Sequence, residues 1–252
     1  MKKYDLANIS TKAPKELDKE EYKKKTEKIL AKLPELQDKL YAQGTYSLLI
    51  ILQGVDASGK DGAVKAVFKG VNPSGCSVTS WKAPTELERK HDFLWRIHKE
   101  VPEKGMIKVF NRSHYEDVLI TRVEKWIDDA ESQKRFTHIN NFEKLISEAN
   151  HTIILKFYLH ISKEEQLERL QERIDDPTKN WKYNANDLKV NEKWDEYRKV
   201  YENAFESCSD IPWVIVPADQ NWYKEYLISK TIVETLENLK LEYPLLAKED
   251  TK

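Results

Sequence analysis

Short apolar runs alternate along this chain with longer amphipathic stretches. The apolar run at residues 46–53 is too short for a free helix and predicts a buried strand, and further short strands are predicted at residues 77–80, 105–110, 152–159 and 212–216. Apolar residues at helical spacing predict helices at residues 15–40, 59–69, 85–99, 133–149, 162–174, 190–208 and 226–241. This alternation is typical of a parallel sheet with helices on both faces, so the pattern predicts a three-layer α/β/α fold with a five-stranded parallel sheet.

Local signals refine several of these elements. Pro34 interrupts the first helical stretch, which is therefore one helix or a helix pair. Thr85 followed by Glu88 three residues later predicts a capping box at the start of the 85–99 helix, and Ser162 is expected to cap the helix that follows it. Residues 177–186 are polar, aromatic and basic without periodicity, which predicts a loop.

Composition limits the functional classes. The 252 residues include 42 Lys and Arg against 43 Asp and Glu, so the net charge is -1 and no general attraction to nucleic acid or to an anionic membrane is expected. Any site for a polyanion must therefore be local. We find neither a secretory signal nor an apolar run of the ~20 residues that a membrane span needs, and we expect a cytoplasmic protein.

A glycine loop follows the first predicted strand and opens the next predicted helix. Gly54, Gly59 and Lys60 have the spacing of a P-loop, in which backbone N–H groups hold phosphate and the lysine reaches its outer oxygens. A tight turn without a ligand is the alternative, but the strand before and the helix after favour phosphate binding. The residues expected to bind phosphate here are Gly54, Ala57, Ser58, Gly59, Lys60 and Gly62.

Two acidic residues make this loop unusual. Asp61 occupies the position where most P-loops have a Ser or Thr that binds Mg²⁺, and Asp56 lies inside the loop. Two carboxylates would repel a polyanion unless a cation lies between them. The loop therefore predicts a metal-dependent phosphate site.

A second polar segment follows the third predicted strand and should face the loop, because ligands bind beyond the carboxyl ends of parallel strands. It contains Asn111, Arg112, Glu116 and Asp117. The planar guanidinium of Arg112 is suited to clamp a phosphoryl group, and Asp117 is predicted to complete a Mg²⁺ site with Asp56. The alternative is that both acids only stabilise a helix N-terminus.

Further basic residues at two places in the chain are candidates. Arg173, Lys179 and Lys182 lie in and before the predicted loop, as in a mobile lid over a phosphate site, with a generic basic loop as the alternative. Arg122 lies one helical turn beyond the second segment and is expected either to face the same cleft or to form a surface ion pair.

Residues 54–62, 110–119 and 172–182 together resemble the three signatures of the family-2 polyphosphate kinases, and the resemblance extends over about residues 15–240. It implies a P-loop kinase-like fold and reversible phosphoryl transfer between inorganic polyphosphate and a nucleotide, dependent on Mg²⁺ with Mn²⁺ as an alternative. It also implies a homo-oligomer, a dimer or tetramer. By this resemblance the functional positions are Asp56, Lys60, Asp61, Arg112, Glu116, Asp117, Arg122 and Arg173.

We therefore expect one domain over residues 1–252, with a helical extension at about 1–43 and a lid at about 170–190. ADP or GDP is the expected acceptor. AMP as an additional acceptor, an ATP-dependent nucleotide monophosphate kinase, and a binding module without turnover are the alternatives; the carboxylates in the loop argue against the last.

Overall fold

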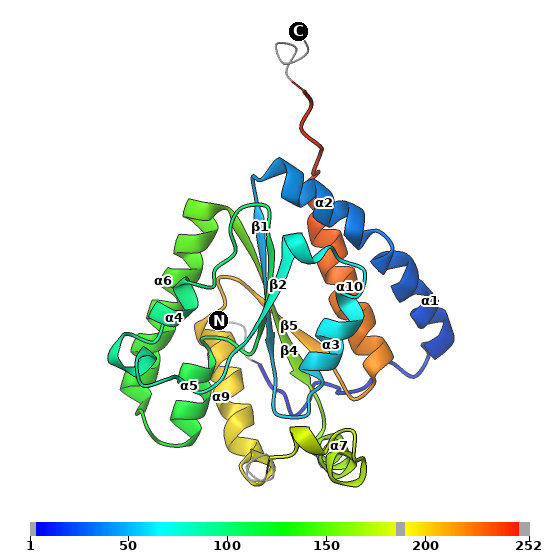
Figure 1. Ribbon diagram of the computed structural model, residues 1–252. Helices are drawn as coiled ribbons and strands as arrows, with labels where there is room; N and C mark the ends of the chain where they lie inside the picture. The colour runs from blue at the N-terminus through cyan, green and yellow to red at the C-terminus, as the bar shows by residue number, and fades with distance from the viewer. Residues whose placement is uncertain (1–3, 185–189, 247–252) are drawn as a thin grey trace.

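The computed structural model describes residues 4–184 and 190–246 and is built around a parallel sheet of five strands in the order β2-β3-β1-β4-β5 (Figure 1). All pairings are parallel, and the central strand β1 is buried along its whole length. The predicted number and direction of the strands are confirmed. The strands are β1 Ser47–Gln53, β2 Cys76–Ser80, β3 Ile107–Asn111, β4 Thr152–His160 and β5 Trp213–Pro217.

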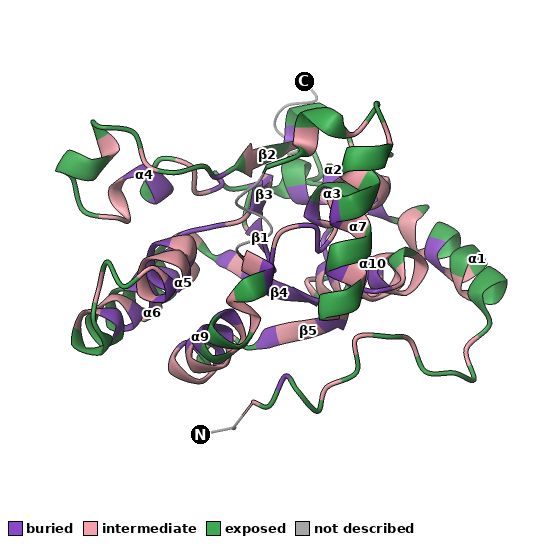
Figure 2. Ribbon diagram, turned by 90° about the horizontal axis from the view of Figure 1, so that it is seen from below, coloured by how far each residue is buried: buried purple, intermediate pink, exposed green. Residues whose placement is uncertain are grey.

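Helices cover both faces of the sheet, which confirms the three-layer prediction. Helices α5, α6 and α9 lie on one face, and α1, α2, α3 and α10 lie on the other (Figure 2). The helices are α1 Lys19–Leu30, α2 Leu33–Gln43, α3 Lys60–Val67, α4 Trp95–His98, α5 Glu116–Val123, α6 Asp129–Asn150, α7 Lys163–Asp175, α9 Trp194–Ser207 and α10 Asn221–Asn238, with 3₁₀ turns at Pro73–Gly75, Glu88–Lys90 and Asn180–Lys182.

The predicted helix at residues 85–99 is wrong. Thr85 and Glu88 do form the capping box, because the Thr85 N–H donates to Glu88 Oε2 at 2.6 Å and the Glu88 N–H donates to Thr85 Oγ1 at 3.2 Å. Only one 3₁₀ turn follows. The carboxylate of Asp92 then accepts the N–H of Leu94 at 2.9 Å, a local bond that competes with helix continuation. The short helix α4 begins only after this turn.

The stretch at residues 15–40 is a helix pair, α1 and α2, with Pro34 in the first turn of α2. Helix α1 packs on α10, and the segment before it crosses beyond β5 (Figure 2). Leu6 of that segment is buried, and His160 at the end of β4 bonds to the Leu6 carbonyl at 3.1 Å. No described helix is both long and apolar enough to cross a membrane.

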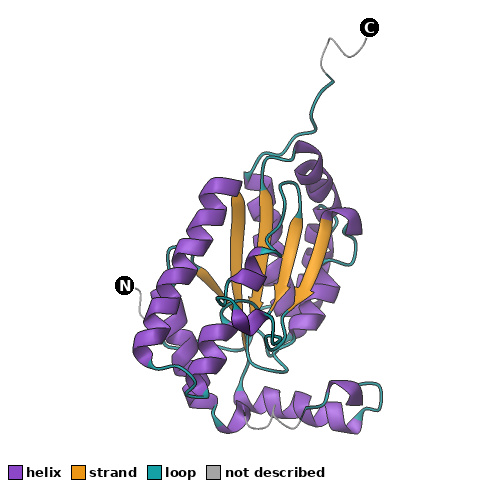
Figure 3. Ribbon diagram, turned by 60° about the vertical axis from the view of Figure 1, so that its left-hand side comes forward, coloured by secondary structure: helices purple, strands orange, loops and turns teal. Residues whose placement is uncertain are grey.

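The carboxyl ends of the strands meet at one end of the molecule, where α7 lies across them (Figure 3). The chain leaves β1 toward β2 and β3 on one side of the sheet and later builds β4 and β5 on the other side, so β1 is at the reversal of strand order. In open α/β sheets, ligands bind at such a point, beyond the strand ends.

Candidate active site

A cleft of about 870 Å³ lies at this end of the sheet. Its walls come from the loop after β1, the segments after β2 and β3, helix α7 and the segment that follows it. Cations outnumber carboxylates in its lining although the whole chain has a net charge of -1. The cations are Lys60, Lys82, Arg112, Arg169, Arg173, Lys179 and Lys182, and the carboxylates are Asp56, Asp61 and Glu172.

Backbone conformation explains the glycines of the loop. Gly59 precedes α3 with φ +92°, and a Cβ there would lie 2.5 Å from Lys224 Nζ. Gly54 has φ +150°, and a Cβ there would lie 2.8 Å from the Leu159 carbonyl oxygen. Ala57 (φ +63°) and Arg112 (φ +66°) adopt left-handed conformations without being glycine. Such strained positions cost about 1–3 kcal/mol each and often occur at ligand sites.

Lys60 is buried at the start of α3 and folds back on the loop. Its Nζ donates to the carbonyls of Gly54 at 2.7 Å and Val55 at 3.1 Å, and to Ser58 Oγ at 3.3 Å. Burial, together with the nearby charge of Arg112, lowers the pKa of Lys60 to about 8. Within the described chain the hydrogen-bond acceptors of this ammonium are neutral oxygens, and the charges of Asp56, Glu116 and Asp61 act on it without a direct bond.

Asp61 connects the loop to two other walls of the cleft. One carboxylate oxygen accepts from Asn111 Nδ2 at 2.7 Å and the other from Lys182 Nζ at 3.0 Å. Burial raises the pKa of Asp61, but these two donors outweigh it, so the pKa lies below its usual value. Asp61 thus joins α3 to Asn111 at the end of β3 and to Lys182 in the segment after α7.

Asp56, Arg112 and Glu116 lie together. Arg112 NH2 forms an ion pair with Asp56, and its NH1 lies 3.5 Å from Glu116 Oε2. With its amide oriented to accept from Ser113, Gln53 also donates to Glu116, at 2.8 Å. Burial raises the pKa of Glu116, while the positive charges of Arg112 and Lys60 oppose that rise. Arg112 therefore lies between two carboxylates, those of Asp56 and Glu116. The carboxylate predicted to lie near Asp56 was that of Asp117.

The structure does not bring Asp117 into this group. Within the described residues, Asp117 lines neither of the two pockets that Asp56 lines, and its Oδ2 accepts from Arg96 NH2 at 3.1 Å. Burial raises the pKa of Asp117, and the charge of Arg96 opposes it. Because α5 begins at Glu116, successive residues point about 100° apart, and Asp117 faces α4 when Glu116 faces Asp56. The expected Asp56–Asp117 pair is thus not formed here.

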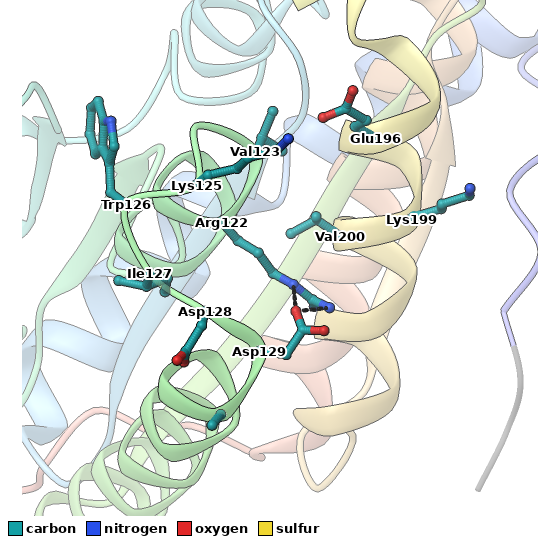
Figure 4. A pocket seen from close by; sticks show the side chains of 11 residues that line it. Arg122, Val123, Lys125, Trp126, Ile127, Asp128, Asp129, Glu196, Lys199 and Val200 are labelled. Carbon is teal, nitrogen blue, oxygen red and sulfur yellow. Dashed lines mark hydrogen bonds and ion pairs between the residues drawn. The ribbon is translucent and has the colours of Figure 1, made fainter.

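Arg122 also lies away from the cleft. Its guanidinium pairs with Asp129 at 2.8 Å and donates to Asn203 Oδ1 at 2.6 Å. It lines a separate pocket of about 820 Å³ between α9 and the link from α5 to α6, where Figure 4 shows it pointing to Asp129. The ion pair that the sequence offered as the alternative is the arrangement found.

The basic residues in the last turn of α7 and after it do face the cleft. Arg173 NH1 donates to the Lys182 carbonyl at 3.3 Å, and Lys179 pairs with Glu172 at 2.5 Å. Trp181 projects into solvent with 78% of its surface exposed. Residues 185–189 of the expected lid lie outside the described part of the chain.

The middle of the second motif anchors the turn in the core. His114 and Tyr115 are fully buried, and the Tyr115 hydroxyl donates to Glu143 Oε1 at 2.9 Å. Lys156 Nζ contacts the same hydroxyl at 2.9 Å and Glu143 Oε2 at 2.8 Å. Arg112 and Glu116, on either side of these buried residues, are thereby held at the cleft.

Sequence reasoning missed a set of residues that support the loop from outside: Gln166, Arg169 and Lys224. A signal was present for the first two, since Gln166, Arg169 and Arg173 recur at helical spacing on α7 and must share one face. Lys224, on the last helix, had no such signal.

Comparison with known proteins identifies a family for this chain. The profile of the family Polyphosphate kinase 2 (PPK2) matches residues 16–244. A protein of Meiothermus ruber named AMP/ADP-polyphosphate phosphotransferase is 49% identical over 215 residues, covering 84% of this chain and 80% of that protein. One of Rhodopseudomonas palustris named ADP-polyphosphate phosphotransferase is 43% identical over 257 residues, covering 96% and 89%.

A solved structure has the same fold. The crystal structure of polyphosphate kinase 2 from Arthrobacter aurescens TC1 superposes with a TM-score of 0.93 at 42% identity, covering 96% of this chain and 88% of that one. The resemblance noted from the three sequence signatures and the P-loop kinase-like fold are confirmed. On the family match and these identities, this chain belongs to the polyphosphate kinase 2 family.

Proposed function

We propose that this polyphosphate kinase transfers a phosphoryl group reversibly between inorganic polyphosphate and a nucleotide in the cleft at the end of β1, with ADP or GDP as the main acceptor. The observation that carries the proposal is the local excess of cations. Seven Lys and Arg side chains line the cleft against three carboxylates, in a chain whose net charge is -1. A donor and an acceptor that are both polyanions require such a surplus.

Lys60 and the first turn of α3 would bind the reacting phosphates. The first N–H groups of a helix have no partner within it and carry the positive end of its dipole. Arg112 would clamp the transferred group, and Arg173, Lys179 and Lys182 would contact the polyphosphate or nucleotide from the lid side. Phosphoryl transfer needs mainly positioning and charge neutralisation, so no general base is invoked for a nucleotide phosphate as nucleophile.

Asp56 fits a role as a Mg²⁺ or Mn²⁺ ligand. Mg²⁺ commonly binds through one or two carboxylates, with substrate phosphates and water filling the rest of its shell. Asp56 lines the cleft beside Glu116, whereas no three His, Cys, Asp or Glu side chains among the described residues are grouped to hold a metal by themselves. Bound Mg²⁺ would neutralise and orient the phosphate oxygens. Asp117 would take part only after exchange of its Arg96 partner.

The names of two relatives support ADP as acceptor, since one is called an ADP-polyphosphate and the other an AMP/ADP-polyphosphate phosphotransferase. Use of AMP in addition is the second candidate and rests on the first of those names. Asp117 bears on this choice through Arg96, whose NH1 donates to the carbonyl of Lys82 in the cleft wall at 2.9 Å.

The test is a nucleotide panel. AMP, ADP, GMP and GDP are each incubated with polyphosphate and Mg²⁺, and the products are separated by anion exchange. We expect ATP from ADP and GTP from GDP, and no product when polyphosphate is omitted. Efficient phosphorylation of AMP by ATP, without any use of polyphosphate, would instead identify a nucleotide monophosphate kinase. Lys60→Ala is the control for the site and should remove turnover from a folded protein.

We further propose that the chain acts in the cytoplasm as a homo-oligomer, a dimer or tetramer. Support comes from the large apolar side chains left exposed in the described chain, among them Tyr41, Leu87 and Tyr243. Size-exclusion chromatography with light scattering measures the mass; a monomer at micromolar concentration would contradict the assembly.

A further inference from the structure

The outer side of the phosphate loop is held by side chains from two helices. Gln166 Nε2 donates to the Asp56 carbonyl at 3.0 Å, and Arg169 NH1 donates to the Ala57 carbonyl at 3.0 Å, both from α7. From α10, Lys224 Nζ donates to the Gly59 carbonyl at 3.2 Å. Each of these donors fixes the direction of one loop carbonyl, and the N–H group of the same peptide points the opposite way.

Lys224 differs from the other two because it is a buried ammonium without an ion pair. Only 1% of its surface is exposed, and its second acceptor is the neutral Asn221 Oδ1 at 2.7 Å. Within residues 4–184 and 190–246, no carboxylate oxygen lies within ion-pair distance of its Nζ. The fully buried Lys156, by contrast, is paired with Glu143 at 2.8 Å. A buried charge without a counter-charge costs free energy, so the Lys224 ammonium requires a compensating negative group.

The charged groups around Lys224 do not supply that compensation. Burial and the neighbouring Arg169 lower the pKa of Lys224 to about 8, against weaker opposing effects of Glu225 and Glu165. Glu165 is itself bonded to Arg169 Nε at 2.7 Å. The ammonium packs directly against the phosphate loop, because a Cβ on Gly59 would lie 2.5 Å from its Nζ.

We propose that Lys224 is a positioning residue of the phosphate loop, which holds the Gly59 peptide with its carbonyl outward and places a positive charge behind the bound polyphosphate. The inference rests on the proposed function, in which that loop takes a phosphate. Lys60 approaches the phosphate from inside the loop, and Lys224 acts on it through the loop. A unit charge several ångströms away at an effective dielectric of about 20 corresponds to a roughly tenfold or larger change in affinity.

Lys224→Met tests this, because it keeps most of the side-chain volume and removes the charge and the donor. Calorimetric titration with inorganic tripolyphosphate should give about tenfold weaker binding and a shallower dependence of affinity on salt concentration. In turnover assays KM for polyphosphate should rise more than kcat falls. Lys230→Met is the matched control on the same helix, since Lys230 is exposed and pairs with Glu234 at 3.8 Å; it should bind tripolyphosphate as the wild type does.

Lys224→Gln separates charge from position, because it is neutral but keeps a donor. Tripolyphosphate affinity close to that of Lys224→Met supports the role of the charge. Affinity restored to the wild-type value contradicts it. If Lys224→Met does not fold, NMR of the labelled lysines in the wild type serves instead: tripolyphosphate should shift the titration of Lys224 to higher pH, and an unchanged titration overturns the proposal.

The outcomes distinguish this inference from the proposed function. A wild type that neither binds tripolyphosphate nor uses polyphosphate would overturn the proposed function itself. A wild type that does both, with Lys60→Ala inactive and Lys224→Met binding within twofold of the wild type, would overturn only the role of Lys224.

Discussion

Replacing Lys156 by Met should destabilise the protein strongly, because Lys156 joins β4 to the buried turn that carries Arg112 and Glu116. Its ammonium is fully buried and bonds to Glu143 at 2.8 Å, the Tyr115 hydroxyl at 2.9 Å and the Cys208 carbonyl at 3.0 Å. Breaking a buried pair by removing one partner typically costs about 3–5 kcal/mol of unfolding free energy.

The structure favours the lower end of that range. Without Lys156, Glu143 keeps the Tyr115 hydroxyl at 2.9 Å and His114 at 3.4 Å as neighbours, so its carboxylate is not left alone. We therefore expect a loss of about 3 kcal/mol, which corresponds to a fall in melting temperature of roughly 6–12 °C for a chain of this size. Turnover should fall as well, since Tyr115 lies between Arg112 and Glu116.

Urea unfolding followed by far-UV circular dichroism measures the loss, with an unchanged m-value as the sign that the denatured state is the same. Lys144→Met is the matched control, because Lys144 is exposed and lies 3.9 Å from Glu148. The double variant Glu143→Leu with Lys156→Met should be more stable than Lys156→Met alone, since it removes both charges of the buried pair. A loss below about 1 kcal/mol for Lys156→Met would refute this account of the network.

Four further outcomes are expected. Lys60→Ala should fold normally and lose at least about 100-fold in turnover, measured with polyphosphate and ADP; near wild-type rates would contradict its role. Burial lowers the pKa of Lys60 to about 8 in the free enzyme, so kcat/KM for polyphosphate should fall as pH rises above that value. Over the same pH range the stability of the free enzyme should rise relative to that of Lys60→Ala, because the unfolded state then binds more protons than the folded state. Asp117→Asn weakens the pair with Arg96 and should change the ratio of AMP to ADP turnover, so an unchanged ratio speaks against any part in acceptor choice. Gly59→Ala, at φ +92° and 2.5 Å from Lys224 Nζ, should destabilise the protein by at least about 1 kcal/mol in thermal unfolding.

The fold was predictable because its signals are local in the sequence. Most strands are short apolar runs, with the partly exposed edge strand β2 as the exception, and the glycine loop lies between a buried strand and a helix start, as the structure has it. The one wrong helix, residues 85–99, shows the limit of local patterns. The predicted cap is present, but the chain becomes extended at His91, and the Asp92 carboxylate then accepts the Leu94 N–H in a local bond that competes with a helix.

The site was less predictable because each charged group depends on a partner that is distant in the sequence. Asp117 was expected to face Asp56, but Arg96, 21 residues earlier, takes its carboxylate. Arg122 is taken by Asn203, 81 residues later, and by Asp129. No periodicity encodes these pairings, which arise when α4, α5 and α9 pack together.

The ion pair between Asp61 and Lys182 determines how firmly the segment after α7 is held against α3. It links the fixed helix α3 to the segment after α7, and both side chains are partly exposed, 63% and 34%. An exposed pair contributes at most about 1 kcal/mol, which corresponds to a ratio of about five to one. As far as this contact decides, the ion pair is therefore broken in at least about one molecule in six without any ligand, and added salt increases that share. A polyanion that binds Lys182 in place of Asp61 therefore loses little free energy by breaking this ion pair.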